Sequence, residues 1–445
     1  MDWRRRQLLT VIGASGVGTL AGCGGLLTGG EESNRTGDGE SDYLSQEAKL
    51  APEDGDSGDE FGNAVALADD GSMALVAAEE DEDPNGEGAG SAYIFGRTDN
   101  GWSQGAKLAP EDGVSGDGFG ESVALAEDGS TALVGAETAD DPNGEQTGAA
   151  YVFARDGNSW SQQAKLVAND GDDGDRFGFS VALAGDGSTA LIGAEEDDEP
   201  NGEAAGAAYV FARDGTSWSQ GAKLAPEDGD SGDDFGWRIA LAEDGSTALV
   251  GAYEDDEPNG EEAGSAYVFA RSGNTWSQGA KLAPGDGDSG DKFGESVALA
   301  ADGSIALIGT SLDDNSNGEE AGSAYVYARD GTSWSQQAKL VAEDGDEEDW
   351  FGFSVALADD GSTGLIAALG DRNDSGSAYV FSSSGDNWSQ GAKLASDDGD
   401  SLDLFGASVA LDGDGSTALL GAQLDDDPNG DEAGSAYVFE EPWAQ

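Results

Sequence analysis

The sequence contains no histidine and a single cysteine, Cys23, among 445 residues. Without histidine, a Ser-His-Asp triad and a Cys-His pair are both excluded, and so are zinc sites built from His and Cys. With one cysteine, no disulfide can form within the chain. The fold must therefore be stabilised by packing, and carboxylates are the catalytic groups that remain.

Positive charge is scarce as well. There are 20 Lys and Arg residues against 91 Asp and Glu residues, which gives a formal net charge of -71. At low ionic strength such self-repulsion opposes a compact state. Salt at about 1 M shortens the Debye length to about 3 Å and makes the same surface tolerable. The composition predicts a halophilic host, and it excludes nucleic acid as a partner because phosphates attract cationic surfaces.

Runs of helical period are absent from the sequence, and its 72 glycines would weaken any helix. A Phe-Gly pair instead recurs along the chain, with a step of 58 residues five times and then 54. A period this long indicates a supersecondary unit that buries its apolar face against its neighbours. The first residues of the pairs are Phe61, Phe119, Phe177, Phe235, Phe293, Phe351 and Phe405.

Each repeat is consistent with four short strands. In the third repeat they are residues 177–184 (FGFSVALA), 188–194 (STALIGA), 206–213 (GAAYVFAR) and 217–224 (SWSQGAKL). Short β-rich runs joined by Asp-Gly turns are typical of hairpins. Seven such units predict an all-β fold over residues 43–445, a seven-bladed β-propeller of four-stranded antiparallel blades. A right-handed solenoid is the alternative.

The two ends of the repeat region favour the ring. Residues 44–50 match a fourth strand, whereas the last repeat stops after its third strand, residues 434–440. We expect the N-terminal strand to join the last blade, which removes the open edge strands, and Trp443 to pack at that seam. The Tyr and Trp residues that recur in strands three and four are interpreted as packing between blades, with stacking platforms for a ligand as the alternative.

The first 42 residues look like a leader and a tether. Arg5 and Arg6 precede an apolar stretch of about 13 residues, shorter than the roughly 20 that span a bilayer, and this resembles a Tat export signal of haloarchaeal type. Residues 20–23 (LAGC) spell a lipobox. The sequence thus predicts a signal peptide over residues 1–22, and a lipidated Cys23 on a flexible acidic tether over residues 23–42. An ordinary cleaved signal with an incidental cysteine is the alternative.

The repeat resembles a known family. Phe-Gly opens the first strand and Gly-Ala closes the second, as in Gly193-Ala194 and Gly251-Ala252, and this resembles the FG-GAP repeat of the integrin alpha-subunit propeller and of many microbial surface proteins. The patterns Gly-Ser-Ala-Tyr-Val-Phe and Trp-Ser-Gln are similar to its microbial branch. The resemblance covers about nine tenths of the chain and implies the propeller fold. The family's calcium cage between strands one and two is expected to be lost, because residues 68–74 form a turn too short and too poor in oxygen.

The loops between strands two and three are the candidate metal sites. They place oxygen-bearing side chains at positions 1, 3 and 5 with glycine at position 6, as in the first half of an EF-hand loop, although the Glu of position 12 is missing. The loops are candidates for weak Ca²⁺ binding, completed by backbone carbonyls or by the 4-1 loop, for example Asp54, Asp56 and Asp59. The alternative is a solvated loop with a Pro-Asn-Gly turn. The candidate ligands are Asp81, Asp83, Asn85, Asp197, Glu199, Asn201, Asp255, Glu257, Asn259, Asp313, Asn315, Asn317, Asp425, Asp427 and Asn429.

Three positions vary from repeat to repeat: the residues before and after Phe-Gly, and the residue after Gly-Ala. All three are expected near the mouth of the face that carries the long loops. Aromatic side chains with arginine amid anionic loops are what a binding patch needs, with drift in blade packing as the alternative. The candidate patch is Arg176, Phe179, Trp237, Arg238, Tyr253, Trp350 and Phe353.

These observations predict a non-catalytic cell-surface lipoprotein, exported by the Tat pathway and anchored to the outer face of the cytoplasmic membrane by its lipid alone. It would recognise a surface protein or a glycan through the long-loop face, as an adhesion or binding module. One alternative is a structural envelope component without a specific ligand. Another is a glycoside hydrolase with two carboxylates, which is disfavoured because the acidic residues repeat in nearly every unit, whereas an acid/base pair is local.

Overall fold

The structure is a computed structural model that describes residues 43–141, 143–385, 387–441 and 443. These residues belong to the repeat region. The predicted signal peptide, Cys23 and the tether lie outside them. Within the described residues no helix is long and apolar enough to cross a bilayer.

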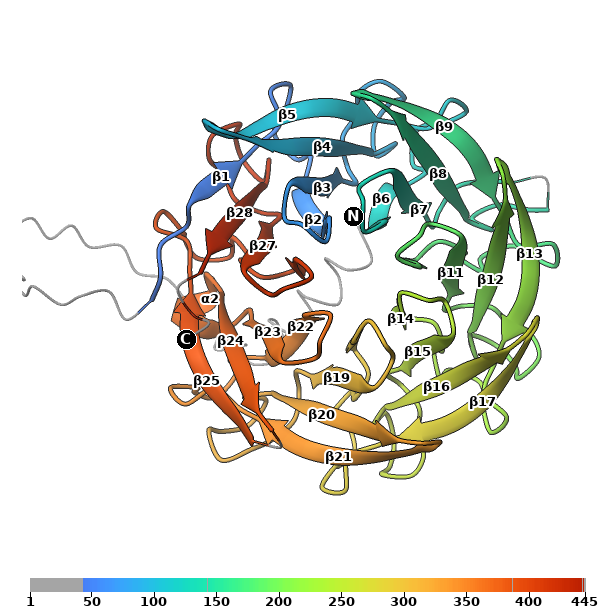
Figure 1. Ribbon diagram of the computed structural model, residues 1–445, viewed down its shortest axis with the longest axis vertical. Coiled ribbons are helices and arrows are strands. Elements are labelled where there is room, and N and C mark those ends of the chain that lie inside the picture. The colour runs from blue at the N-terminus through green and yellow to red at the C-terminus, as the bar shows by residue number, and fades with distance from the viewer. Residues whose placement is uncertain (1–42, 142, 386, 442, 444–445) are drawn as a thin grey trace, which may run out of the picture. The chain divides into compact units, whose positions relative to one another are not determined.

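Seven four-stranded antiparallel sheets are arranged radially around a central axis (Figure 1). The chain forms a seven-bladed β-propeller, as predicted. In blade 1 the strands are β2 (Phe61–Leu67), β3 (Met73–Ala78), β4 (Ser91–Thr98) and β5 (Gly101–Leu108). In blade 2 they are β6 (Phe119–Leu125), β7 (Thr131–Ala136), β8 (Ala149–Asp156) and β9 (Ser159–Leu166). In blade 3 they are β10 (Ser180–Leu183), β11 (Thr189–Ala194), β12 (Ala207–Asp214) and β13 (Ser217–Leu224).

The remaining blades follow the same order. Blade 4 contains β14 (Ile239–Leu241), β15 (Thr247–Ala252), β16 (Ser265–Ser272) and β17 (Thr275–Leu282). Blade 5 contains β18 (Ser296–Leu299), β19 (Ile305–Thr310), β20 (Ser323–Asp330) and β21 (Ser333–Leu340). Blade 6 contains β22 (Phe351–Leu357), β23 (Thr363–Ala368), the short helix α2 (Asp371–Asp374), β24 (Ser377–Ser384) and β25 (Asn387–Leu394). Blade 7 contains β26 (Val409–Leu411), β27 (Thr417–Ala422), β28 (Ser435–Glu440) and β1 (Ala48–Leu50).

The burial of a strand depends on its place in the blade. The first strand of each blade lies nearest the axis and the fourth lies at the rim (Figure 1). The second strand is buried along almost its whole length, whereas the fourth alternates between exposed and half-buried residues. Each Phe-Gly phenylalanine packs edge-on against third-strand rings of its own blade, as Phe61 does against Tyr93 at 5.6 Å between centroids. Tyr93 is fully buried, so the recurring tyrosines are core residues.

The ring closes through both ends of the repeat region. β1 pairs antiparallel with β28, with Lys49 opposite Tyr437. Trp443 is buried, and its Nε1 donates to the Gly415 carbonyl at 2.9 Å, so the predicted seam is confirmed and the solenoid is excluded. The closing strand is shorter than the predicted residues 44–50. Leu44 instead donates its N–H to the Lys393 carbonyl of blade 6 at 2.9 Å.

The first strands also differ from prediction in several blades. β10 begins at Ser180, three residues after the predicted start at Phe177. The intervening Gly178 has a φ of +103° and donates its N–H to the Gly193 carbonyl, so the chain bends before it enters the sheet.

The turns between strands one and two meet at the axis. One residue of each turn donates its N–H to the carbonyl of the equivalent residue in the next blade, and the circuit closes on itself. Its members, in order, are Asp69, Glu127, Gly185, Glu243, Ala301, Asp359 and Gly413, which donates back to Asp69 at 2.9 Å. This circuit ties the seven blades together on the short-turn face.

Candidate functional site: the long-loop face

The long loops of a blade are held by one lysine of its fourth strand. In blade 1 the Lys107 Nζ lies 2.8 Å from Asp81 of the 2-3 loop and 3.0 Å from Asp54 of the 4-1 loop. The Tyr93 hydroxyl donates to the same Asp81 carboxylate at 2.6 Å. Seven of the eight lysines occupy this position: Lys49, Lys107, Lys165, Lys223, Lys281, Lys339 and Lys393.

The same contacts give structural roles to the residues of the EF-hand-like pattern in the 2-3 loop. The second oxygen of Asp81 accepts the backbone N–H of Asp83 at 2.8 Å, so the first position of the loop pattern is used structurally. At the fifth position, the Asn85 side-chain amide donates to the Pro110 carbonyl at 3.0 Å, which joins the loop to the next blade. The Asp83 residue at the third position is exposed. The same bonds recur at Asp197 and Asn201, at Asp255 and Asn259, and at Asp425 and Asn429.

In blade 5 the loop pattern is held slightly differently. Asp313 is buried against Lys339, with 2.9 Å between Nζ and Oδ2. Asn315 accepts the N–H of Asn317 and donates to the Gly322 carbonyl, and Asn317 donates to the Ala342 carbonyl at 2.7 Å. In these loops the side chains at positions 1 and 5 thus make hydrogen bonds at different places. Calcium binding by these loops stays a prediction.

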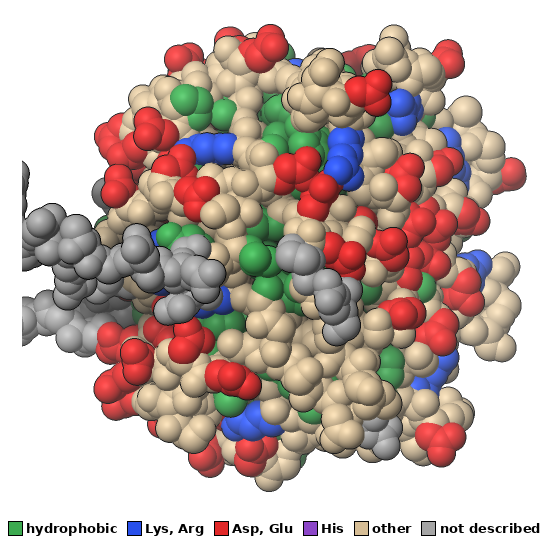
Figure 2. Space-filling model, turned by 60° about the vertical axis from the view of Figure 1, so that its left-hand side comes forward, with side chains coloured by type: hydrophobic (Ala, Val, Ile, Leu, Met, Phe, Trp, Pro, Cys, Tyr) green, Lys and Arg blue, Asp and Glu red, His purple; other side chains and the backbone are tan. Residues whose placement is uncertain are grey.

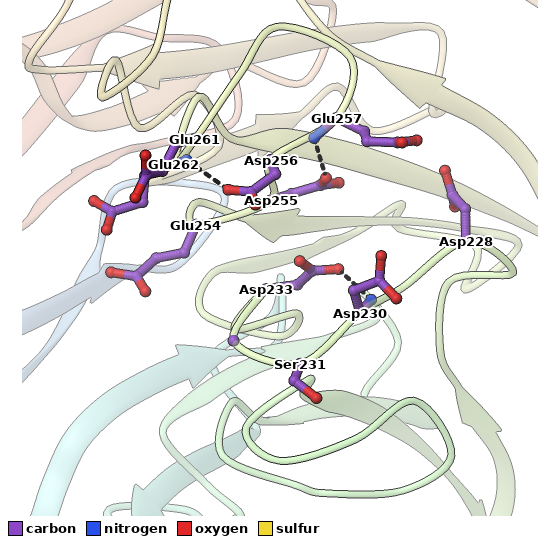
Figure 3. A pocket seen from close by; sticks show the side chains of 11 residues that line it. Asp228, Asp230, Ser231, Asp233, Glu254, Asp255, Asp256, Glu257, Glu261 and Glu262 are labelled. Atoms are coloured by element: carbon purple, nitrogen blue, oxygen red, sulfur yellow. Dashed lines mark hydrogen bonds between the residues drawn. The ribbon is translucent and has the colours of Figure 1, made fainter.

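The 2-3 loop and the 4-1 loop of blade 4 enclose an acidic cavity of about 240 Å³ (Figure 3). It combines Asp255 and Glu257 of the predicted loop with Asp230 and Asp233 of the 4-1 loop. Hydrogen bonds fix both walls: Glu257 N–H to Asp255 at 2.8 Å, and Asp230 N–H to Asp233 at 2.7 Å. Carboxylate oxygens that converge from two loops are the ligands that Ca²⁺ takes in proteins.

Burial and lysine set the charge of this cavity. Burial raises the pKa of Asp233 to about 6. Burial would also raise the pKa of Asp228, but the hydrogen bond and positive charge of Lys281 lower it below its ordinary value. On the side of the molecule that Figure 2 shows, Asp and Glu side chains are spread across the surface and basic side chains lie as isolated groups. This surface is therefore strongly electronegative.

The predicted aromatic patch is partly assembled. The Phe179 and Trp237 rings lie 4.7 Å apart, and the Trp237 and Tyr253 rings lie 4.2 Å apart. The Arg238 guanidinium lies 5.3 Å from both the Phe179 and the Trp237 rings. The three rings are buried, so they pack as a core at the mouth of the ring, and Arg238 is the half-buried group that covers them.

The other patch residues lie apart from this stack. Arg176 contacts the carboxylates of Glu195 at 3.6 Å and Glu196 at 3.4 Å. Trp350 is buried in blade 6, with its Nε1 3.4 Å from a Glu320 carboxylate oxygen of blade 5, and Phe353 is half-buried in β22. Ligand binding by the seven patch residues stays a prediction.

Backbone geometry marks the residue before each Phe-Gly pair. All seven have φ between +53° and +62°, the left-handed region that favours glycine, yet only Gly118 is a glycine. A side chain there costs about 1 kcal/mol or more. The other six are Glu60, Arg176, Asp234, Lys292, Trp350 and Leu404. Six of the seven blades thus have a side chain at the mouth of the ring, although the backbone conformation there favours glycine.

Two large apolar side chains are exposed on the 4-1 loops, and sequence reasoning missed both. Val114 is 55% exposed and Leu402 is 46% exposed. Five of the seven repeats have glycine at the Leu402 position and six have aspartate at the Val114 position. Leu402 moreover has a φ of +75°. The signal in the sequence was this departure from the other repeats.

The sequence comparison agrees with this architecture. The profile of the FG-GAP repeat matches residues 44–95, 102–153, 160–211, 218–269, 276–327, 334–381 and 388–439. Each match runs from the fourth strand of one blade into the third strand of the next, so the profile itself spans the seam between blades. The protein is an integrin-like propeller. The chain belongs to the FG-GAP repeat family. No curated protein matches the sequence.

Proposed function

We propose that the protein is a non-catalytic binding module of adhesion type, which takes a surface protein or a glycan at its long-loop face. FG-GAP propellers are in general binding modules without catalytic activity. The observation that carries the proposal is the asymmetry of the ring. Within the described residues, the long loops, the left-handed side chains and the two exposed apolar groups belong to one face, while the other carries short turns.

The loop clamps support this assignment. Because a lysine, a tyrosine and two aspartates hold the long loops of most blades, ligand binding would require little ordering of the loops. We further propose that Ca²⁺ binds weakly in acidic cavities such as that of blade 4, where it would offset the negative charge that the two loops bring together.

The carboxylates themselves argue for binding over glycoside hydrolysis. Burial raises the pKa of Asp59, Asp175, Asp233, Asp291, Asp349 and Asp403 to about 6, a value suited to a general acid. The shift recurs at the same position of six blades, which indicates a property of the repeat and not a single catalytic pair.

We also propose that the protein is a lipoprotein of a halophile, exported by the Tat pathway and anchored to the outer face of the cytoplasmic membrane through Cys23. The motifs of residues 1–23 and the net charge of -71 support this proposal. Mass spectrometry of Cys23 from the native host tests it, since a lipid-modified N-terminal cysteine is expected and an unmodified one contradicts it.

The binding proposal is tested with variants that restore the residues of the other repeats. The double variant Val114→Asp, Leu402→Gly removes both exposed apolar side chains, and it relieves the left-handed leucine, so the fold should be kept. In pull-downs from host envelope in molar NaCl, we expect at least tenfold less partner than with the unchanged protein. Asp128→Asn, in a turn of the opposite face, is the matched control. Equal recovery with all three proteins would leave a structural envelope component as the better interpretation.

A further inference from the structure

The mouth of the ring on the long-loop face has two chemically different sectors. In blades 3 and 4 the residues after Phe-Gly and after Gly-Ala form the aromatic stack of Phe179, Trp237 and Tyr253. Around blades 1 and 2 the equivalent positions are Glu79, Glu121 and Glu137. Trp237 and Tyr253 belong to one blade and touch, and Glu121 and Glu137 occupy the same two positions of blade 2.

These three glutamates converge. One carboxylate oxygen from each lies within 4.8 Å of the others. Their residues are 7%, 2% and 6% exposed, so the group is withdrawn from solvent. Burying several ionised carboxylates together is costly unless a cation or shared protons offset the charge.

Glu195 extends the cluster into blade 3. It follows β11 as Glu137 follows β7, and it is 2% exposed. The cation against it is the Arg176 guanidinium, 3.6 Å from one oxygen. Arg176 thus lies against Glu195, and its charge also interacts with that of Glu137.

A buried side-chain amide of blade 1 contacts the backbone of blade 2 at this point. Asn63 holds the Glu121 position in blade 1, and it is 4% exposed. Its Nδ2 donates to the Gly120 carbonyl at 2.9 Å, while its Oδ1 accepts no hydrogen bond. Gly120 directly precedes Glu121, so this hydrogen bond holds the Asn63 side chain next to the backbone of the cluster. A buried amide oxygen that accepts no hydrogen bond is a suitable ligand for a cation.

The backbone of blade 2 leaves room at this point. Gly118 is the one glycine among the seven residues that precede Phe-Gly. A Cβ atom there would lie 3.3 Å from a carboxylate oxygen of Glu79 and 2.9 Å from the Thr138 hydroxyl. Any side chain at this position would therefore press on the cluster, and the glycine keeps the space beside Glu79 open.

We propose that Glu79, Glu121 and Glu137, together with the Asn63 amide oxygen, form a buried site for one Ca²⁺ ion. Carboxylate and amide oxygens are the ligands that Ca²⁺ takes, and a flexible set of oxygens suits it. Mg²⁺ keeps several waters when it binds to protein, and these burial levels favour the cation that gives up its water. The site is separate from the loop cavities, and it joins blade 1 to blade 2 at the mouth of the ring.

Calorimetry on the whole protein tests the proposal. Protein stripped with EDTA is titrated with CaCl₂ in molar NaCl, as the unchanged protein and as the double variant Glu121→Gln, Glu137→Gln. The matched control is Glu295→Gln, at the Glu121 position of blade 5, where the carboxylate accepts a hydrogen bond from Ser311. We expect the double variant to bind one Ca²⁺ fewer than the other two proteins. Equal stoichiometry in all three overturns the proposal.

A second measurement does not depend on the variants. In crystals of the unchanged protein grown with Mn²⁺ in place of Ca²⁺, an anomalous peak among the three glutamates is expected. Peaks confined to the exposed loops would overturn the proposal and would leave calcium binding by those loops possible.

The melting temperature gives a third test. Without calcium, the double variant should melt at a higher temperature than the unchanged protein, because it lacks two buried negative charges. A lower melting temperature of the variant would contradict the buried cluster.

Discussion

The ammonium group of Lys107 lies 2.8 Å from the buried carboxylate of Asp81 and joins the last strand of blade 1 to its 2-3 loop. Six of the seven blades contain this ion pair, and blade 2 has Ala139 in place of the aspartate. Seven of the eight lysines of the chain occupy this position in the fourth strand. The pair therefore explains how a protein of such negative charge keeps its longest loops in one conformation.

Removing this lysine should lower the free energy of unfolding more in a blade that has the aspartate than in blade 2, which lacks it. Lys107→Met leaves the buried Asp81 without its cation, and we expect a loss of about 2 kcal/mol in the free energy of unfolding. Lys165→Met of blade 2 is the matched control, because Lys165 pairs with the exposed Asp112 and the Tyr151 hydroxyl and Ala139 replaces the buried aspartate. It should cost about 1 kcal/mol or less. Denaturant unfolding in molar NaCl measures both, and equal losses would contradict this account of the clamp.

Supplying the missing aspartate should stabilise blade 2. Ala139→Asp would place a carboxylate near Lys165 and Tyr151, as Asp81 lies near Lys107 and Tyr93. We expect a gain of up to about 1 kcal/mol. In the Lys165→Met background the same substitution should destabilise, since the new charge is then buried without a partner. A double-mutant cycle measures the difference, and a coupling free energy near zero would refute the prediction.

Mild acid should stabilise the fold. Burial raises the pKa of Asp59 and of five equivalent aspartates to about 6, above the value near 3.8 of an exposed aspartate. Their contribution is complete below the unfolded pKa and is lost as the pH rises through 6. The melting temperature in molar NaCl is therefore expected to rise as the pH falls from 7.5 to 5. A fall in the melting temperature over that range would contradict the raised pKa values of these carboxylates in the folded state.

A neutral residue at position 234 should raise the melting temperature at neutral and alkaline pH. Burial, and then the charge of Glu254, raise the pKa of Asp234 to about 8. Folding near pH 7 thus requires this group to take up a proton, and the cost grows with pH until about 8. Asp234→Asn should raise the melting temperature at pH 8 and change it little at pH 4. An equal rise in the melting temperature at both pH values would contradict the raised pKa of Asp234.

The sequence predicted the propeller because the strand pattern repeats seven times and each repeat agrees with the others. It did not predict that β10 starts only at Ser180 while β2 starts at Phe61, because the two repeats have the same Phe-Gly pattern. The lysine clamp was missed although its lysines recur with the repeat. Its partners follow from a register that places Lys107 opposite Tyr93 and under the 2-3 loop, which the pattern of residues alone does not give.

The candidate site was predicted less well than the fold. Variation between repeats singled out Phe179, Trp237 and Tyr253, whose rings contact one another and are buried, and their role in ligand binding stays a prediction. The glutamates around blade 2 looked like part of the general acidity of the chain. Their convergence depends on the curvature of the ring, which brings the same positions of neighbouring blades together, and only the structure shows it.

Hydrogen–deuterium exchange with and without Ca²⁺ in molar NaCl tests the central claim, that the long-loop face is the binding face. The account predicts calcium-dependent protection in peptides covering the cavity walls, residues 228–233 and 254–262, and none in the short turn at 243–246. The short-turn face offers a competing group, since carboxylate oxygens of Asp69, Glu243 and Asp359 lie within 4.8 Å of one another there. Protection confined to that turn, with the long loops unchanged, would contradict the account.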